Sequence, residues 1–118
     1  MSEYREKRQH QRQEGTFPFR YRETLGTPSP FRGALVKDVS LGGLRFRTES
    51  FLPLDTSLIL ELSLPESARP VRAITRVAWS RKLPAGERYE IGSEFVEMIP
   101  SEKRTLEGFL EAEAAGNA

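Results

Sequence analysis

The feature that most constrains how this chain can fold is an alternation of apolar and polar residues with a period of two. Its clearest run places leucines at every second position: Leu58, Leu60, Leu62 and Leu64. Because successive side chains of a strand point to opposite faces, this run predicts a strand with one face in the core. We therefore expect the four leucines to be buried.

Weaker forms of the same alternation predict further strands, which turns containing Gly or Pro separate. In chain order the predicted strands cover Phe17–Arg22, Phe31–Val39, Leu44–Thr48, Ser57–Leu64, Val71–Lys82 and Tyr89–Met98. Helical spacing follows at Leu106, Phe109 and Leu110, after a start signal at Ser101, and ends before Gly116. Strands and helices do not alternate, which excludes a parallel doubly wound sheet. The expected fold is mainly all-β: a small antiparallel barrel with one short C-terminal helix.

Residues 1–16 contain little that a core could bury, since Tyr4 is the one sizeable apolar side chain after Met1. We interpret this stretch as a flexible N-terminal arm. Residues 17–115 are then the folded domain, with the barrel followed by the helix.

The composition argues against an enzyme. The chain has no cysteine and a single histidine, His10, so disulfides, thiolate nucleophiles and sulfur-ligated metals are excluded. The glutamates at positions 87, 90, 94 and 97 have the spacing of solvated faces. Neither a general base nor a metal site can be assembled, so we expect no catalytic residues, no metal and no cofactor.

The same composition bears on location. No apolar run reaches the roughly 18 residues that a membrane span needs, and the N-terminus lacks the apolar core of a signal peptide. We therefore expect a cytoplasmic protein without membrane insertion.

Charge is unevenly distributed along the chain. Residues 1–86 hold 15 Lys and Arg against 9 Asp and Glu, whereas residues 87–118 hold 3 against 8. The basic part can attract an anion. The acidic part disfavours a rival interpretation, a small barrel that binds single-stranded nucleic acid, because such barrels need a basic groove lined with aromatic residues.

The densest polar segment is Asp38-Val39-Ser40-Leu41-Gly42-Gly43, a D-x-S-x-x-G pattern at the end of a predicted strand. A carboxylate and a hydroxyl two residues apart share a face of an extended chain. The glycines after them permit positive φ and close approach of a ligand to the backbone. A strand end followed by a turn explains the same residues equally well.

A second candidate is the R-x-x-x-R spacing of Arg8 and Arg12. The planar guanidinium fork suits phosphates and the O6/N7 edge of guanine. This signal is weak alone, because the arginine-rich chain repeats the spacing at Arg72 and Arg76.

Together and in this order, the two motifs resemble the PilZ domain family, and the resemblance extends along almost the whole chain. Arg76-Val77-Ala78-Trp79 looks like the family's strand that ends in tryptophan, and Gly92-Ser93-Glu94-Phe95 looks like its G-x-x-F strand. Lys7 stands where many relatives have a further arginine. The resemblance implies a six-stranded antiparallel barrel with a C-terminal helix.

The resemblance also implies a ligand, the bacterial second messenger cyclic di-GMP, which the arginine arm would clamp onto the barrel. By carry-over, Arg8 and Arg12 would bind phosphate oxygens and guanine Hoogsteen edges. Asp38 would accept hydrogen bonds from a guanine edge, and Ser40 would contact phosphate or base. Gly42 and Gly43 would let the ligand lie against the backbone.

The expected function is that of a stand-alone, non-enzymatic receptor, which signals through an unidentified protein effector. Motility, type IV pili, exopolysaccharide synthesis and transcription are all compatible outputs. The alternative is a ligand-independent PilZ-like adaptor. Trp79 is expected inside the barrel, with a ring facing a ligand or partner as the alternative, and Arg45 and Arg47 are expected to point outward.

Overall fold

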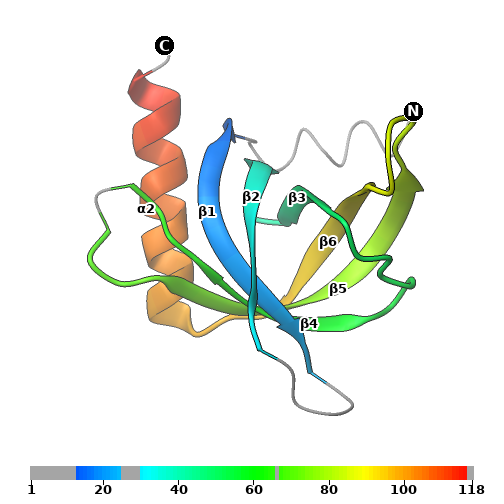
Figure 1. Ribbon diagram of the computed structural model, residues 1–118. Coiled ribbons are helices and arrows are strands. Elements are labelled where there is room, and N and C mark those ends of the chain that lie inside the picture. The colour runs from blue at the N-terminus through cyan, green and yellow to red at the C-terminus, as the bar shows by residue number, and fades with distance from the viewer. Residues whose placement is uncertain (1–12, 25–29, 66, 117–118) are drawn as a thin grey trace, which may run out of the picture.

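The computed structural model describes residues 13–24, 30–65 and 67–116, with the backbone alone at 13–16 and 116. The elements are β1 (Gln13–Glu23), β2 (Arg32–Val39), β3 (Gly43–Thr48), β4 (Ser57–Leu62), β5 (Val71–Lys82), β6 (Tyr89–Glu97) and α2 (Pro100–Gly116). The strands form a closed antiparallel barrel in the order β1-β2-β3-β6-β5-β4, and α2 stands outside it beside β1 (Figure 1). The predicted barrel with a C-terminal helix is confirmed.

The observed elements follow the predicted ones closely, and the largest difference is at β1. Strand β5 has the predicted bounds, and β6 ends one residue early, at Glu97. Strand β1 begins at Gln13, inside the stretch assigned to the arm, because residues 13 and 14 pair with Val39 and Asp38 of β2. Backbone pairing extends the strand beyond the point at which apolar alternation begins.

The core is the inside of the barrel. The four alternating leucines are buried as predicted, and Leu64 remains buried although β4 ends at Leu62. Aromatic rings fill the centre: the Phe46 ring meets the Phe19 ring edge-on at 4.9 Å and the Tyr21 ring at 5.3 Å. This packing makes the barrel a firm support for the residues on its outer face.

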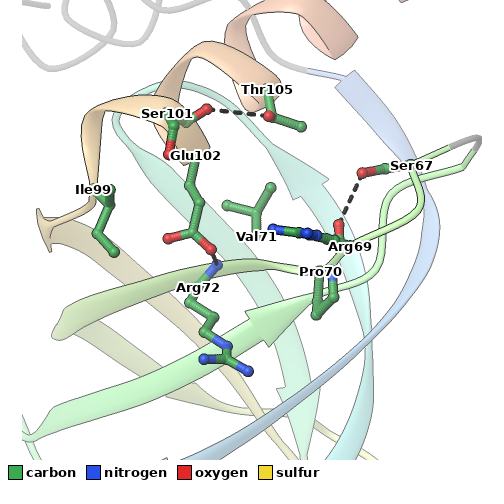
Figure 2. A pocket seen from close by; sticks show the side chains of 9 residues that line it. All are labelled: Ser67, Arg69, Pro70, Val71, Arg72, Ile99, Ser101, Glu102 and Thr105. Carbon is green, nitrogen blue, oxygen red and sulfur yellow. Dashed lines mark hydrogen bonds between the residues drawn. The ribbon is translucent and has the colours of Figure 1, made fainter.

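Helix α2 covers one end of the barrel. Leu106 and Leu110 are its buried residues, and the Phe109 ring meets the Phe17 ring of β1 edge-on at 5.2 Å. The backbone N–H of Arg72 donates to Glu102 Oε1 at 3.1 Å, which joins the first turn of α2 to β5 (Figure 2). In the described part of the chain, no helix has the length and apolar character to cross a membrane.

We predict that Phe46→Ala lowers the free energy of unfolding by about 3–5 kcal/mol, because it leaves a cavity at the centre of the core. Phe51→Ala is the matched control, since Phe51 is 61% exposed and only its edge contact with Tyr89 is lost. Urea unfolding followed by circular dichroism measures both variants. Equal destabilisation by the two substitutions would contradict this account of the core.

Candidate functional site

A β-bulge in β2 places Asp38 on the outside of the barrel. Strict alternation would put Asp38 on the same face as Val36, which lies in the core. The register shifts between them: Val36 pairs with Phe46, and Asp38 pairs with Arg45, the very next residue along β3. The extra residue in β2 turns the Asp38 carboxylate outward, where it meets a cation rather than the apolar core.

A second β-bulge, in β5, places Trp79 on the outside of the barrel. Val77 pairs with Ser93, and Trp79 pairs with Gly92, so β5 advances two residues while β6 advances one. The prediction that Trp79 is buried in the barrel is therefore wrong, and its side chain is 38% exposed. A Cβ atom on Gly92 would lie 2.1 Å from Trp79 Nε1, so the missing side chain of Gly92 lets the indole lie against β6.

These two bulges create one row of residues across four strands. Asp38 of β2 pairs with Arg45 of β3, Arg45 pairs with Gly92 of β6, and Gly92 pairs with Trp79 of β5. Arg45 Nη2 lies 2.8 Å from Asp38 Oδ2. The row brings together a carboxylate, a guanidinium and a flat aromatic ring on a rigid surface.

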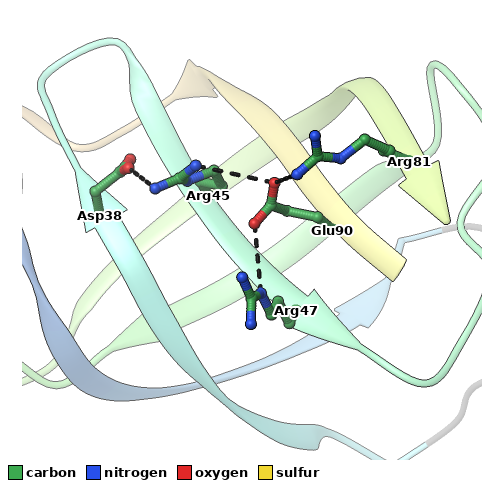
Figure 3. A network of polar contacts seen from close by, with 5 residues as sticks. All are labelled: Asp38, Arg45, Arg47, Arg81 and Glu90. Atoms are coloured by element: carbon green, nitrogen blue, oxygen red, sulfur yellow. Dashed lines mark hydrogen bonds and ion pairs between the residues drawn. The ribbon is translucent and has the colours of Figure 1, made fainter. Parts of the chain in front are cut away.

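The neighbouring row is centred on Glu90, whose side chain is 3% exposed. Arg81 Nη2 donates to Glu90 Oε1 at 2.7 Å, and Arg47 Nε donates to Oε2 at 3.4 Å (Figure 3). Arg45 Nη1 lies 3.9 Å from Oε1, so this arginine connects Glu90 to Asp38. The prediction that Glu90 belongs to a solvated face is wrong: three arginine side chains cover it from the solvent side of the barrel.

The D-x-S-x-x-G segment ends in the tight turn between β2 and β3. The Ser40 backbone N–H donates to the Gly43 carbonyl at 2.9 Å, and the Gly42 N–H donates to Ser40 Oγ at 3.1 Å. The Ser40 hydroxyl accepts in this turn, so its proton is free to be donated elsewhere. The turn thus holds Ser40 two residues beyond Asp38, at one end of the outer row.

Gly43 of the turn has a structural reason of its own. A Cβ atom on Gly43 would lie 2.0 Å from the Ser93 carbonyl oxygen, so close pairing of β3 with β6 requires glycine there. Neither Gly42 nor Gly43 is among the positive-φ residues of the described chain, so the expected use of positive φ is wrong. The Gly42 carbonyl accepts from the Phe95 N–H at 2.9 Å, which fixes the turn to β6.

The structure brings Asp38, Ser40, Gly42 and Gly43 into one corner of the barrel, as the motif predicts. Arg8 and Arg12, the other two candidates, lie outside the described residues. Arg45 was not among the predicted site residues. Its outward position in the alternation of β3 was predicted, but its partner on β2 depends on the bulge.

The arrangement is suited to binding. Among the described residues, no group of three or more His, Cys, Asp or Glu side chains could hold a metal ion. A carboxylate such as Asp38 can accept the paired N–H groups of a guanine edge, and an exposed indole can stack on a base. The row therefore matches a ligand with flat bases and anionic groups.

A separate cavity lies away from this row. It measures about 590 Å³ and lies between the β4–β5 connection and the first turn of α2 (Figure 2). Arg69, Arg72 and Glu102 are among the residues that line it. Asp38, Ser40, Gly42 and Gly43 are not among the described residues that line this cavity, so it is separate from their corner of the barrel.

Comparison with known proteins points to one family. The family profile described as PilZ domain matches residues 6–112, which is most of the chain. No curated protein sequence matches the chain.

Solved structures share the fold at low sequence identity. The Bacillus subtilis inhibitor of motility, MotI or DgrA, superimposes with a TM-score of 0.76 at 18% identity, over 92% of this chain and 51% of that protein. This chain thus spans about half the length of MotI. The PilZ domain of YcgR from Escherichia coli, solved with c-di-GMP, superimposes with a TM-score of 0.64 at 17% identity. The match covers 92% of this chain and 94% of that domain. A tetrameric PilZ domain protein from Xanthomonas campestris superimposes with a TM-score of 0.55 at 15% identity, over 77% of this chain and 49% of that protein.

We predict that Glu90→Gln lowers the free energy of unfolding by about 1–3 kcal/mol, because it removes a buried carboxylate that several guanidinium groups share. Glu94→Gln is the matched control: this residue lies on the same strand, and its side chain is 56% exposed beside Arg76. Glu94→Gln should lower the free energy of unfolding by less than about 1 kcal/mol. Urea unfolding of both variants tests the difference, and similar costs would mean that Glu90 is not central to the network.

Proposed function

Since the chain belongs to the PilZ domain family, we propose that it is a non-enzymatic receptor for cyclic di-GMP. The observation that carries the proposal is the outer row, in which Asp38 and the Ser40 turn lie at one end and Trp79 at the other. The PilZ domain of YcgR, whose fold this chain shares, was solved with this ligand. We propose that this chain binds the same ligand.

Asp38 is the proposed acceptor for a guanine edge. A guanine presents two adjacent N–H donors, and an ionised carboxylate can accept both at once. Arg45 holds Asp38 Oδ2 at 2.8 Å, so the carboxylate is oriented before the ligand arrives. Because each carboxylate oxygen has two lone pairs, Arg45 and a guanine can share the group.

Trp79 is the proposed stacking surface. The indole lies against β6 over Gly92, which leaves its outer side open to a flat base. Arg45 is opposite Gly92 in the same row and supplies a positive charge between the ring and Asp38. An aromatic platform beside a cation suits an anionic ligand with two bases.

Arg8 and Arg12 are the proposed phosphate and Hoogsteen-edge contacts, in keeping with the family motif that they match. Their guanidinium forks would supply charge that the described row lacks, since Arg45, Arg47 and Arg81 are already shared with Asp38 or Glu90. Ser40, Gly42 and Gly43 complete the proposed contacts at the turn.

The proposed output is a protein–protein contact that changes when the ligand binds. The ligand is a bacterial second messenger, so we place the receptor in the cytoplasm and its partner among regulators of motility or exopolysaccharide synthesis. The alternative is a ligand-independent adaptor. A folded chain that does not bind the nucleotide would favour that alternative.

We predict that cyclic di-GMP binds in a calorimetric titration and that Arg12→Ala and Asp38→Ala each lower its affinity roughly 5- to 150-fold. Each substitution removes contacts to a base edge or a phosphate. Arg104→Ala and Glu111→Ala are the matched controls, because both residues are exposed on α2. GTP and cyclic GMP serve as ligand controls. Unchanged affinity in the Arg12 and Asp38 variants would refute the assignment.

We also predict that cyclic di-GMP changes the intrinsic fluorescence of the protein, because Trp79 is the single tryptophan and a base would stack on its ring. The change should saturate with the affinity measured by calorimetry and should shift to higher ligand concentration in Asp38→Ala. A titration in which calorimetry detects binding while the emission stays constant would place the base away from Trp79.

A further inference from the structure

A polar cavity lies at the opposite end of β2 from Asp38. It measures about 360 Å³, and its polar lining includes Tyr21, Arg32, Arg47, Thr48, Ser50 and Arg88. Arg32 is the first residue of β2 and Asp38 the seventh, which separates them by about 20 Å of strand. The ends of β1 and β3, the start of β2 and Arg88 of the β5–β6 connection form this cavity.

Two arginines of this cavity have no anionic partner in the described chain. No described carboxylate lies within ion-pair distance of Arg32 or Arg88. Arg32 instead donates from Nη1 to the Ser50 hydroxyl. Most other arginines on the outer face of the barrel, Arg45 and Arg76 among them, lie beside a carboxylate. The cavity therefore holds positive charge that the described residues leave unbalanced.

The floor of the cavity is a fixed set of hydroxyl groups. The Tyr21 and Thr48 hydroxyls share a hydrogen bond of 2.6 Å, and Tyr21 is only 2% exposed. The Ser50 backbone N–H donates to Thr48 Oγ1 at 3.2 Å. Because these groups bond to one another and to the backbone, they hold their positions without a ligand. Such preorganisation lowers the cost of binding.

We propose that this cavity binds a phosphate monoester. Arg32 and Arg88 face one lining carboxylate, Glu49, and Arg47 is shared with Glu90, so the cavity keeps a net positive charge for a group that carries about −1.5 to −2 at neutral pH. Guanidinium forks and hydroxyl donors are the partners that phosphate oxygens accept from. The volume exceeds that of a phosphate group, so the cavity also holds part of the moiety that carries it.

The site is connected to the Asp38 corner through Arg47, Glu90 and Arg45. Arg47 lines the cavity and also donates from Nε to Glu90 Oε2 at 3.4 Å. Glu90 is near Arg45, the partner of Asp38. A phosphate that draws Arg47 into the cavity would weaken its bond to Glu90. The two sites are separate in space, and the proposal does not depend on cyclic di-GMP binding.

The test is a titration of the full chain with inorganic phosphate at constant ionic strength, followed by the amide resonances of Gly33, Thr48 and Ser50. We expect saturable shifts confined to the cavity, with affinity lowered about tenfold or more in Arg88→Ala and in Arg32→Gln. Arg104→Ala is the matched control, because it removes an exposed arginine of α2 and the same net charge. An equal loss in Arg104→Ala, or none in the cavity variants, would overturn the proposal.

Two further experiments identify the source of the phosphate and distinguish this cavity from the Asp38 corner. Phosphoserine and glucose 6-phosphate represent a modified side chain and a small metabolite, and tighter binding of either one supports the proposal. If neither binds, phosphate is an adventitious ion only, and the proposal fails. Asp38→Ala should retain phosphate binding even if it loses cyclic di-GMP. Loss of phosphate binding in that variant would place the anion at the Asp38 corner instead.

Discussion

Strand β2 has an extra residue against β3 between Val36 and Asp38, and β5 has one against β6 between Val77 and Trp79. These two bulges turn Asp38 and Trp79 outward. Without them, alternation would direct Asp38 and Trp79 toward the core. A carboxylate inside an apolar barrel would be strongly unfavourable, and the indole would compete with Phe46 for space. With them, both side chains join Arg45 on one surface. The candidate site is therefore a consequence of strand register.

Glu90 is the electrostatic centre of that surface. A nearly buried carboxylate is tolerated because guanidinium groups from β3 and β5 surround it. Those groups in turn reach in two directions: Arg45 extends to Asp38, and Arg47 extends to the cavity at the far end of β2. A change in the ion pairs of Arg47 at the cavity can thus alter the ion pairs of Arg45 at Asp38. The shared Glu90 carboxylate connects them, and the barrel need not move.

The comparisons show how little of the sequence the fold itself requires. MotI shares the barrel at 18% identity and the YcgR domain at 17%, so many sets of alternating apolar residues fill such a barrel. Ligand binding constrains the sequence more strongly than the fold does, because it needs particular donors and acceptors at particular places. In this chain the places that we propose for ligand binding are the turn at Ser40 and the outer row that begins with Asp38.

The residue pattern was enough to predict the barrel, its strands and the buried leucines, because alternation and helical spacing are local properties of the chain. It also located the corner at Asp38, Ser40, Gly42 and Gly43. The tertiary structure alone decided that Trp79 faces outward, that Glu90 is buried and that Arg45 joins them. These outcomes depend on bulges and on pairing between strands far apart in the chain, and a bulge moves a side chain to the other face without altering the sequence pattern around it.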